Sequence, residues 1–322
     1  MVNINNFLVL TLILLLNSCD AANQQRSPSS IITDCSRSIK RLFTAPAVSY
    51  PRNYKLYSTL GMEFEGVLPF SIRYKAVAEE IQKKLLDMYP ESGVTVKDLS
   101  YAIPPEIYVE ILEVHYQVMG KKHVITVKND NTVVGSFIPA RRGIEITSTV
   151  MSESSEVNDF VKVLSSLVDS VSLKEAPKTG GIHVHYGLKR KPSLKKTIFL
   201  YKALDKLYDS VAKEFTINKR RDFLGRERLQ NIIKTLEEHQ INKSSREEVN
   251  NTLDARSLIR FVEKFGTVEM RVSNSTLNEN ELHRYTDFVN RFFYSWESES
   301  KKLTELFERA GDVEFHEVMD II

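Results

Sequence analysis

Charged and imidazole side chains alternate with apolar residues in three short segments of this chain, and this period of two constrains the fold most. Residues two apart on a β-strand project from the same face of a sheet, about 7 Å apart. Each segment therefore predicts a strand with one apolar face and one face that presents two polar side chains. The segments are Gly61-Met62-Glu63-Phe64-Glu65-Gly66, Gly180-Gly181-Ile182-His183-Val184-His185, and Gly266-Thr267-Val268-Glu269-Met270-Arg271.

Each polar pair also has a simpler interpretation. The glutamate pair suits the solvated face of an antiparallel sheet, and the histidine pair suits a half-exposed strand or part of a structural zinc site. The Glu269 and Arg271 pair suits a cross-strand ion pair. The occurrence of several such segments in one chain favours a ligand site over these alternatives. Glycine lies close to the polar residues in every segment and allows close backbone approach to a ligand.

A fourth segment, Arg142 to Ser148, places Glu145 in the same kind of setting. The four segments together offer glutamate and histidine side chains completed by an arginine. Carboxylate oxygens with few imidazoles suit Mg²⁺ or Mn²⁺, and a guanidinium group suits a phosphate. The sequence therefore predicts a site for a divalent cation and a phosphorylated ligand.

Taken in order, these segments resemble the amidoligase family, a branch of the carboxylate–amine ligases related to glutamine synthetase. The resemblance extends from about Leu60 to about Phe292. Five motifs carry it in the family's order: Gly61 to Glu65, Asp130-Asn131-Thr132, Gly143 to Ser148, Gly181 to His185, and Thr267 to Arg271 followed by Thr276-Leu277-Asn278.

Two positions depart from the family's pattern. Gly180 stands where the family usually has Cys, and Ser275 stands where it usually has Gly. Neither position has to supply a ligand. The departures therefore concern loop geometry more than chemistry.

The resemblance implies an α+β fold with a glutamine-synthetase-like, mostly antiparallel sheet, flanking helices and a helical insert. It implies that His185 lies near the phosphates of ATP and that Arg271 contacts the transferred phosphoryl group, as a catalytic and nucleotide-binding residue. Asp130 is implied as a second catalytic residue that orients the amine or a ligand residue. The implied ligands of two or three Mg²⁺ or Mn²⁺ ions are Glu63, Glu65, Glu145, His183 and Glu269.

The function that the resemblance implies is ATP-dependent formation of an amide or isopeptide bond. A carboxylate resists attack by an amine, so such a ligase first transfers the γ-phosphoryl group of ATP to it, and the acyl phosphate then accepts the amine. The expected substrates are an amino acid, a peptide or a muropeptide. Two alternatives stay open: an exported, non-catalytic peptide or muropeptide binding protein on the same scaffold, and a metal-dependent hydrolase that activates water.

Length and composition agree with one large domain, which we expect over residues 55–322. The chain has 322 residues, of which 42% are hydrophobic and 27% charged, enough to bury a substantial core. Its formal net charge of +2 implies neither a nucleic-acid partner nor an acidic polymer.

The N-terminus predicts export. A ten-residue, mostly apolar run from Phe7 to Leu16 precedes Asn17-Ser18-Cys19; it is too short to span a bilayer and suits the core of a signal peptide. Leu16 to Cys19 resembles a bacterial lipobox. We therefore expect a signal peptide over residues 1–19 with cleavage before Cys19, a tether over 20–54, and a lipoprotein held at the membrane of the bacterial cell envelope by lipidated Cys19.

Two alternatives to the lipobox remain. An ordinary signal peptide could be cut after Ala21 or Ala22. No Lys or Arg precedes the apolar run, which argues against both kinds of signal peptide. A cytoplasmic protein is the alternative if the start is mis-assigned. Cleavage before Cys19 leaves Cys35 as the only other cysteine. No internal disulfide is then expected if Cys19 is lipidated.

Apolar periodicity predicts the remaining elements. We expect the glutamate strand over 57–67, and a hairpin over 108–126 that turns near 120–122, with a helix as the alternative for its first arm. Trp296 is expected in the core rather than in a ligand site. Helices are expected over 72–89, 154–169, 194–215, 226–239 and, as one stretch, 278–310, the third and fourth forming the insert.

Overall fold

A computed structural model describes the chain from residue 50 onward, with gaps. The described ranges are 50–103, 107–130, 132–133, 141–176, 180–215, 226–242, 258–308 and 313–322. The expected signal peptide, Cys19, Cys35 and most of the expected tether lie outside the described residues.

The compact unit comprises Tyr50–Ile322. The hydroxyl of Tyr50 donates a hydrogen bond to Asp287 (2.7 Å), and its backbone N–H donates to Asn280 (3.2 Å). These contacts fasten the start of the unit to a helix more than 200 residues further along the chain.

The described elements alternate between strands and helices. The strands are β1 (Leu60–Pro69), β2 (Thr95–Asp98), β3 (Tyr101–Ile103), β4 (Ile107–Val109), β5 (Ile111–Val118), β6 (Lys121–Asn129), β7 (Arg141–Thr147), β8 (Lys174–Glu175), β9 (Gly181–Gly187), β10 (Ile259–Val262) and β11 (Thr267–Asn274). The helices are α3 (Tyr74–Met88), α4 (Ser154–Ser170), α5 (Leu194–Glu214), α6 (Arg226–Asn242), α8 (Glu279–Glu297), α9 (Lys301–Glu308) and α10 (Phe315–Ile321), with a 3₁₀ turn η1 at Glu263–Phe265.

One nine-stranded sheet organises the unit. Its strand order is β10-β11-β9-β1-β7-β6-β5-β2, with β8 paired to β1, and β3 and β4 form a separate hairpin. The strand pairings among the described residues are antiparallel. The α+β class and the mostly antiparallel sheet expected from the sequence are therefore confirmed.

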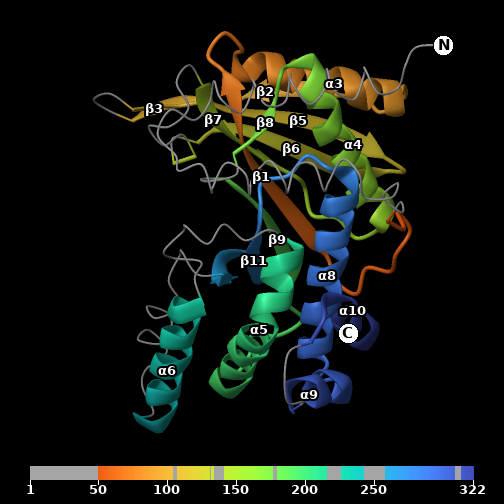
Figure 1. Ribbon diagram of the computed structural model, residues 1–322. Helices are drawn as coiled ribbons and strands as arrows, with labels where there is room; N and C mark the ends of the chain where they lie inside the picture. The colour runs from red at the N-terminus through yellow and green to blue at the C-terminus, as the bar shows by residue number, and fades with distance from the viewer. Residues whose placement is uncertain are drawn as a thin grey trace, which may run out of the picture. The chain divides into compact units, whose positions relative to one another are not determined.

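The register separates an apolar face from a polar one. Phe64 pairs with Ile146, Ile146 with Val127, and Val127 with Leu112, and all four side chains are buried. Helices α3 and α8 contact strands of the sheet on this covered face, and α4 packs against both helices, on the side that Figure 1 shows. The neighbouring residues of each strand point to the opposite side, which we call the open face.

Turn and cap chemistry set the local boundaries. The hairpin between β5 and β6 turns at Met119 and Gly120, whose φ angles of 48° and 80° suit a type I′ turn. The first arm is therefore a strand, and the alternative helix there is wrong. At α4, the side chain of Glu153 and the backbone of Glu156 form a capping box with the reciprocal bond present, and Asn278 caps α8 by accepting from two backbone N–H groups.

The prediction of one continuous helix over 278–310 is wrong, although the stretch is helical. Two helices, α8 and α9, occupy this stretch, and Glu299 between them has a φ of 55°, which a continuing helix does not permit. Trp296 lies in the core as expected, with 1% of its surface exposed. Its indole N–H donates to the carbonyl of Lys196 (2.9 Å).

The helical insert is confirmed between β9 and β10. Helices α5 and α6 pack against each other, and α5 also contacts β11, so the insert braces the strand that carries Glu269. Short strands β2, β3, β4, β8 and β10 were not expected, because they have too few residues to show a periodic pattern. Among the described helices, none combines the length and apolar character required to cross a membrane.

Candidate metal centre

The open face gathers the polar residues that the sequence singled out. Glu63 of β1 pairs directly with His183 of β9, and Glu269 of β11 pairs with His185. On the other side of β1, Glu65 pairs with Glu145 of β7. Four adjacent strands thus bring to one surface side chains that lie up to about 200 positions apart in the sequence.

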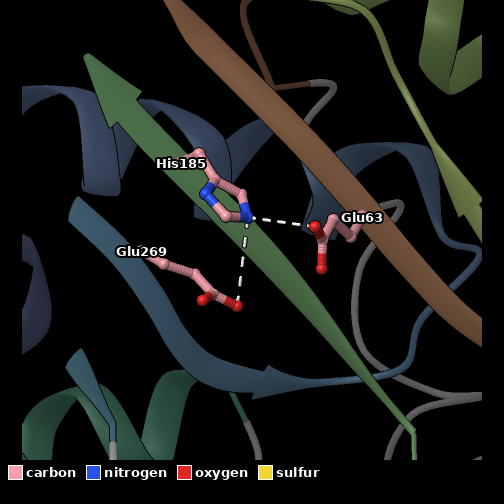
Figure 2. A group of neighbouring side chains, drawn as sticks. All are labelled: Glu63, His185 and Glu269. Carbon is pink, nitrogen blue, oxygen red and sulfur yellow. Dashed lines mark hydrogen bonds and ion pairs between the residues drawn. The ribbon is translucent and has the colours of Figure 1, made fainter. Parts of the chain in front are cut away.

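One group of possible ligands consists of Glu63, His185 and Glu269, which we call the first group. One ligand atom from each lies within 4.8 Å of the others. His185 Nε2 lies 3.2 Å from Glu63 Oε1 and 3.9 Å from Glu269 Oε1, and Figure 2 shows the imidazole between the two carboxylates. Two carboxylates and one imidazole facing a common point are a fitting donor set for Mg²⁺ or Mn²⁺.

A second group consists of Glu65, Asp130 and Glu145, again with ligand atoms within 4.8 Å of one another. Asp130 Oδ1 accepts hydrogen bonds from the backbone N–H (2.8 Å) and the hydroxyl (2.6 Å) of Thr132. The hydroxyl of Thr147 donates to Glu145 Oε1 (3.1 Å). These contacts orient two of the three carboxylates.

His183 lies between the two groups. Its Nδ1 is 3.2 Å from Glu63 Oε2 and 3.3 Å from Glu269 Oε1, and its Nε2 is 3.7 Å from Glu65 Oε2. Only 4% of the residue is exposed. The imidazole therefore connects the carboxylates of the first group to a carboxylate of the second.

The electrostatics of the cluster follow from burial and crowding. Burial acts to raise the pKa of Glu63, but hydrogen bonds from His183 and His185 outweigh it and hold that pKa well below its usual range. Burial acts to lower the pKa of His183, but the bond to Glu63 and the charge of Glu65 raise it. Burial and then the charge of Glu63 raise the pKa of the Glu145 carboxyl.

A buried carboxylate oxygen supports a cation at the first group. Glu269 is fully buried, and its Oε2 has no hydrogen-bond partner in the described part of the chain. Arg271 Nε donates to the other oxygen, Oε1 (2.5 Å), and Arg260 lies 3.9 Å from Oε2. Because a buried carboxylate oxygen without a hydrogen bond is costly, and Arg260 lies beyond hydrogen-bond distance, the donor set of the first group fits a metal ion.

A charge count leads to the same conclusion. The two groups contain five carboxylates, and three cationic side chains contact them: Lys128, Arg260 and Arg271. The carboxylates therefore outnumber these cations, which favours the binding of an additional cation.

A cavity of about 550 Å³ opens beside the first group. Glu63 and His185 line it together with Lys189, Phe265 and Val150, and the last two are about two-thirds exposed. Its size suits a small-molecule ligand. A larger cavity of about 910 Å³ borders the hairpin of β5 and β6, but no residue of the two groups lines it, so the smaller cavity is the better candidate.

The glycines beside the cluster allow the strands and loops to approach closely. A Cβ atom on Gly143 would lie 1.9 Å from the carbonyl oxygen of Asp130, and one on Gly180 would lie 2.5 Å from that of Glu65. Ser275 donates its hydroxyl to the same Glu65 carbonyl (2.6 Å), and its N–H donates to Gly180 (3.3 Å). The two positions that depart from the family's pattern therefore contact each other and jointly support the strand of Glu65.

Every residue that the sequence analysis assigned to the site lies on or beside the open face, but the grouping differs from the expected roles. His185 and Asp130 lie within ligand distance of the two groups, although they were assigned to nucleotide phosphates and to catalysis. Sequence reasoning missed Lys128 and Thr147, which contact Glu145. Thr147 could have been found, because it lies two residues after Glu145 on the same strand. Lys128 could not, because the pairing of β6 with β7 leaves no local signal in the sequence.

Searches for a matching protein-family model and for a matching curated protein found none.

Proposed function

We propose that this protein is a metal-dependent, ATP-driven carboxylate–amine ligase. The observation that carries the proposal is the convergence of five carboxylates, two histidines and Arg271 on one open sheet face, next to a cavity of about 550 Å³. The motif order that resembles the amidoligases adds to it. The mostly antiparallel sheet with helices on one face is compatible with a glutamine-synthetase type of fold, which belongs to the same proposal.

The carboxylates and His185 of the first group would hold the cation, with Glu65, Asp130 and Glu145 as the ligands of any further ion. A divalent ion bound there supplies charge neutralisation for the phosphate oxygens of ATP. Glu269 holds the guanidinium of Arg271 through Oε1, and this contact would orient the planar fork of Arg271 toward a phosphoryl group. The cavity gives the substrate carboxylate access to this region.

The proposed substrates are an amino acid, a peptide or a muropeptide as acid and amine. Export as a lipoprotein through Cys19 remains a prediction for residues outside the described range. Clustered carboxylates repel one another without cations, which favours a metal-binding site over a binding surface that needs no metal.

The first test of the proposal is metal binding. We expect the full chain to bind Mn²⁺, and Glu269→Gln to weaken that binding at least tenfold, because it removes a charged ligand at nearly constant volume. Even mutation of a residue that only hydrogen-bonds a metal ligand typically lowers the metal affinity by about 10–100-fold. Calorimetric titration with circular dichroism as a folding check measures this, and equal affinity of a folded Glu269→Gln variant would contradict the proposal.

The second test is turnover. With ATP, Mg²⁺ and a library of amino acids and muropeptides, we expect ADP formation that depends on both an acid and an amine. Arg271→Lys keeps the charge but loses the planar fork, so it should spare Mn²⁺ binding and slow ADP formation by about tenfold or more. Arg284→Lys, on α8 at the covered side, is the matched control. Metal binding without ADP formation on any substrate pair would instead support a binding protein.

A further inference from the structure

The second acidic group already faces a cation from the protein itself. Lys128 of β6 pairs in register with Glu145 of β7, which pairs with Glu65 of β1. The ammonium Nζ of Lys128 lies 2.6 Å from Glu145 Oε1. This lysine therefore reaches Glu145 from the neighbouring strand, at one end of a row that crosses the open face.

The first group has no equivalent lysine contact among the described ion pairs. Its cations are guanidinium groups: Arg271, two residues from Glu269 on the same strand, and Arg260 at a longer distance. A guanidinium is flat and binds a carboxylate from the side, whereas an ammonium is a compact point charge with donors in several directions. Glu269 also keeps one oxygen without a hydrogen bond, while Glu145 Oε1 contacts both Lys128 and Thr147.

Several acids act on Lys128 together. Burial acts to lower its pKa, but the charge and hydrogen bond of Glu145, followed by the charges of Glu63 and Asp130, raise it. The ammonium thus experiences carboxylates of both groups, as a metal ion at this position would. Its side chain is 38% exposed, so solvent reaches part of it.

We propose that Lys128 occupies the cation position of the second group, and that this group binds a divalent ion only when Lys128 is removed. The first group is then the metal site of the resting protein, in agreement with the buried Oε2 of Glu269, which has no hydrogen-bond partner among the described residues. The inference rests on the metal-binding part of the proposed function and does not require ligase activity.

The test counts bound Mn²⁺ ions in the full chain, by electron paramagnetic resonance of the free ion and by calorimetry. Lys128→Met removes the ammonium and keeps an unbranched stem. We expect this variant to bind one Mn²⁺ ion more per chain than the wild type does. Lys128→Arg, which keeps a positive charge, should retain the wild-type number.

Two further variants assign the additional ion. Glu145→Gln combined with Lys128→Met should lose the gain, because it removes the carboxylate that Lys128 contacts. Lys122→Met removes an exposed positive charge on the same strand, about 20 Å away at about 3.3 Å per residue, and should leave the number unchanged. A gain in this control as well would mean that net charge, rather than the position of Lys128, governs binding and would overturn the inference.

Equal numbers of bound ions in the wild type and in folded Lys128→Met would also overturn the inference. Persistence of the gain in the double variant would do the same, since the ion would then lie elsewhere. Failure of the ligase proposal has a different signature: ion numbers can change as expected while no acid and amine pair produces ADP.

Discussion

The two faces of the central sheet use neighbouring residues of the same strand for opposite purposes. In β1, Met62 and Phe64 are buried under the helices, while Glu63 and Glu65 project to the open face and are only partly covered. The covered face gains stability from apolar burial. The open face brings like charges together, which costs stability unless cations are present, so its composition indicates binding rather than folding.

Two buried histidines show the same contrast. His183 on the open face lies among carboxylates, and its pKa is raised although burial opposes this. His283 of α8 lies under the covered side, where burial lowers its pKa, and neither ring nitrogen has a hydrogen-bond partner in the described part of the chain. The same side chain is thus poised to be charged in one layer and neutral in the other.

The largest expected effect tests the division between the faces. Phe64→Ala should lower the free energy of unfolding by about 3–5 kcal/mol, the usual cost of emptying a buried phenylalanine site. Glu65→Gln, one residue along, should have a much smaller effect, because it relieves repulsion with Glu145 directly opposite. Urea denaturation without metal measures both, and similar losses of stability would break the comparison.

A smaller effect is expected at the glycines beside the cluster. Gly143→Ala should lower the free energy of unfolding by about 1–3 kcal/mol, because the new methyl group would meet the carbonyl oxygen of Asp130 at 1.9 Å. Gly61→Ala is the matched control, since its methyl group would meet Cβ of His185 at an ordinary 3.6 Å. Thermal unfolding of both variants checks this, and an unchanged stability of Gly143→Ala would show that the backbone at Asp130 can move away at little cost.

The smallest expected effect is a pH dependence from His283. Its pKa is lowered in the folded state, so the unfolded chain binds a proton near its ordinary pKa of about 6.5 while the folded chain does not. Stability from this residue is therefore present above about pH 6.5 and decreases as the pH falls through that value, by at most about 1.4 kcal/mol per pH unit.

The groups around His283 are Tyr54, Arg52, Glu279 and Lys162, and the prediction concerns the difference between variant and wild type. Between pH 7.5 and 5, the free energy of unfolding of His283→Phe should decrease by less than that of the wild type. The exposed His316, replaced by Phe, should leave the wild-type pH dependence in place. Parallel pH profiles for wild type and His283→Phe would show that α8 accommodates a charged imidazole.

Local patterns in the sequence were sufficient to predict the long elements and the character of the site. The period of two identified the strands of Glu63, Glu145, His183 and Glu269, and apolar spacing predicted the helices that became α3, α4, α5 and α6. Short strands escaped this reasoning because two to four residues carry no period. The end of α8 also escaped it, since the backbone at Glu299 reverses without a glycine or proline to mark it.

The sequence by itself determined which side chains face away from the core, because alternation along a strand depends only on neighbouring residues. Only the tertiary structure decided which of them meet. Strand order and register place Glu65 beside Glu145 and Lys128 beside Glu145, and they place His185 rather than His183 in the first group. These pairings join residues distant in the chain, so their geometry depends on packing of the whole sheet rather than on any local motif.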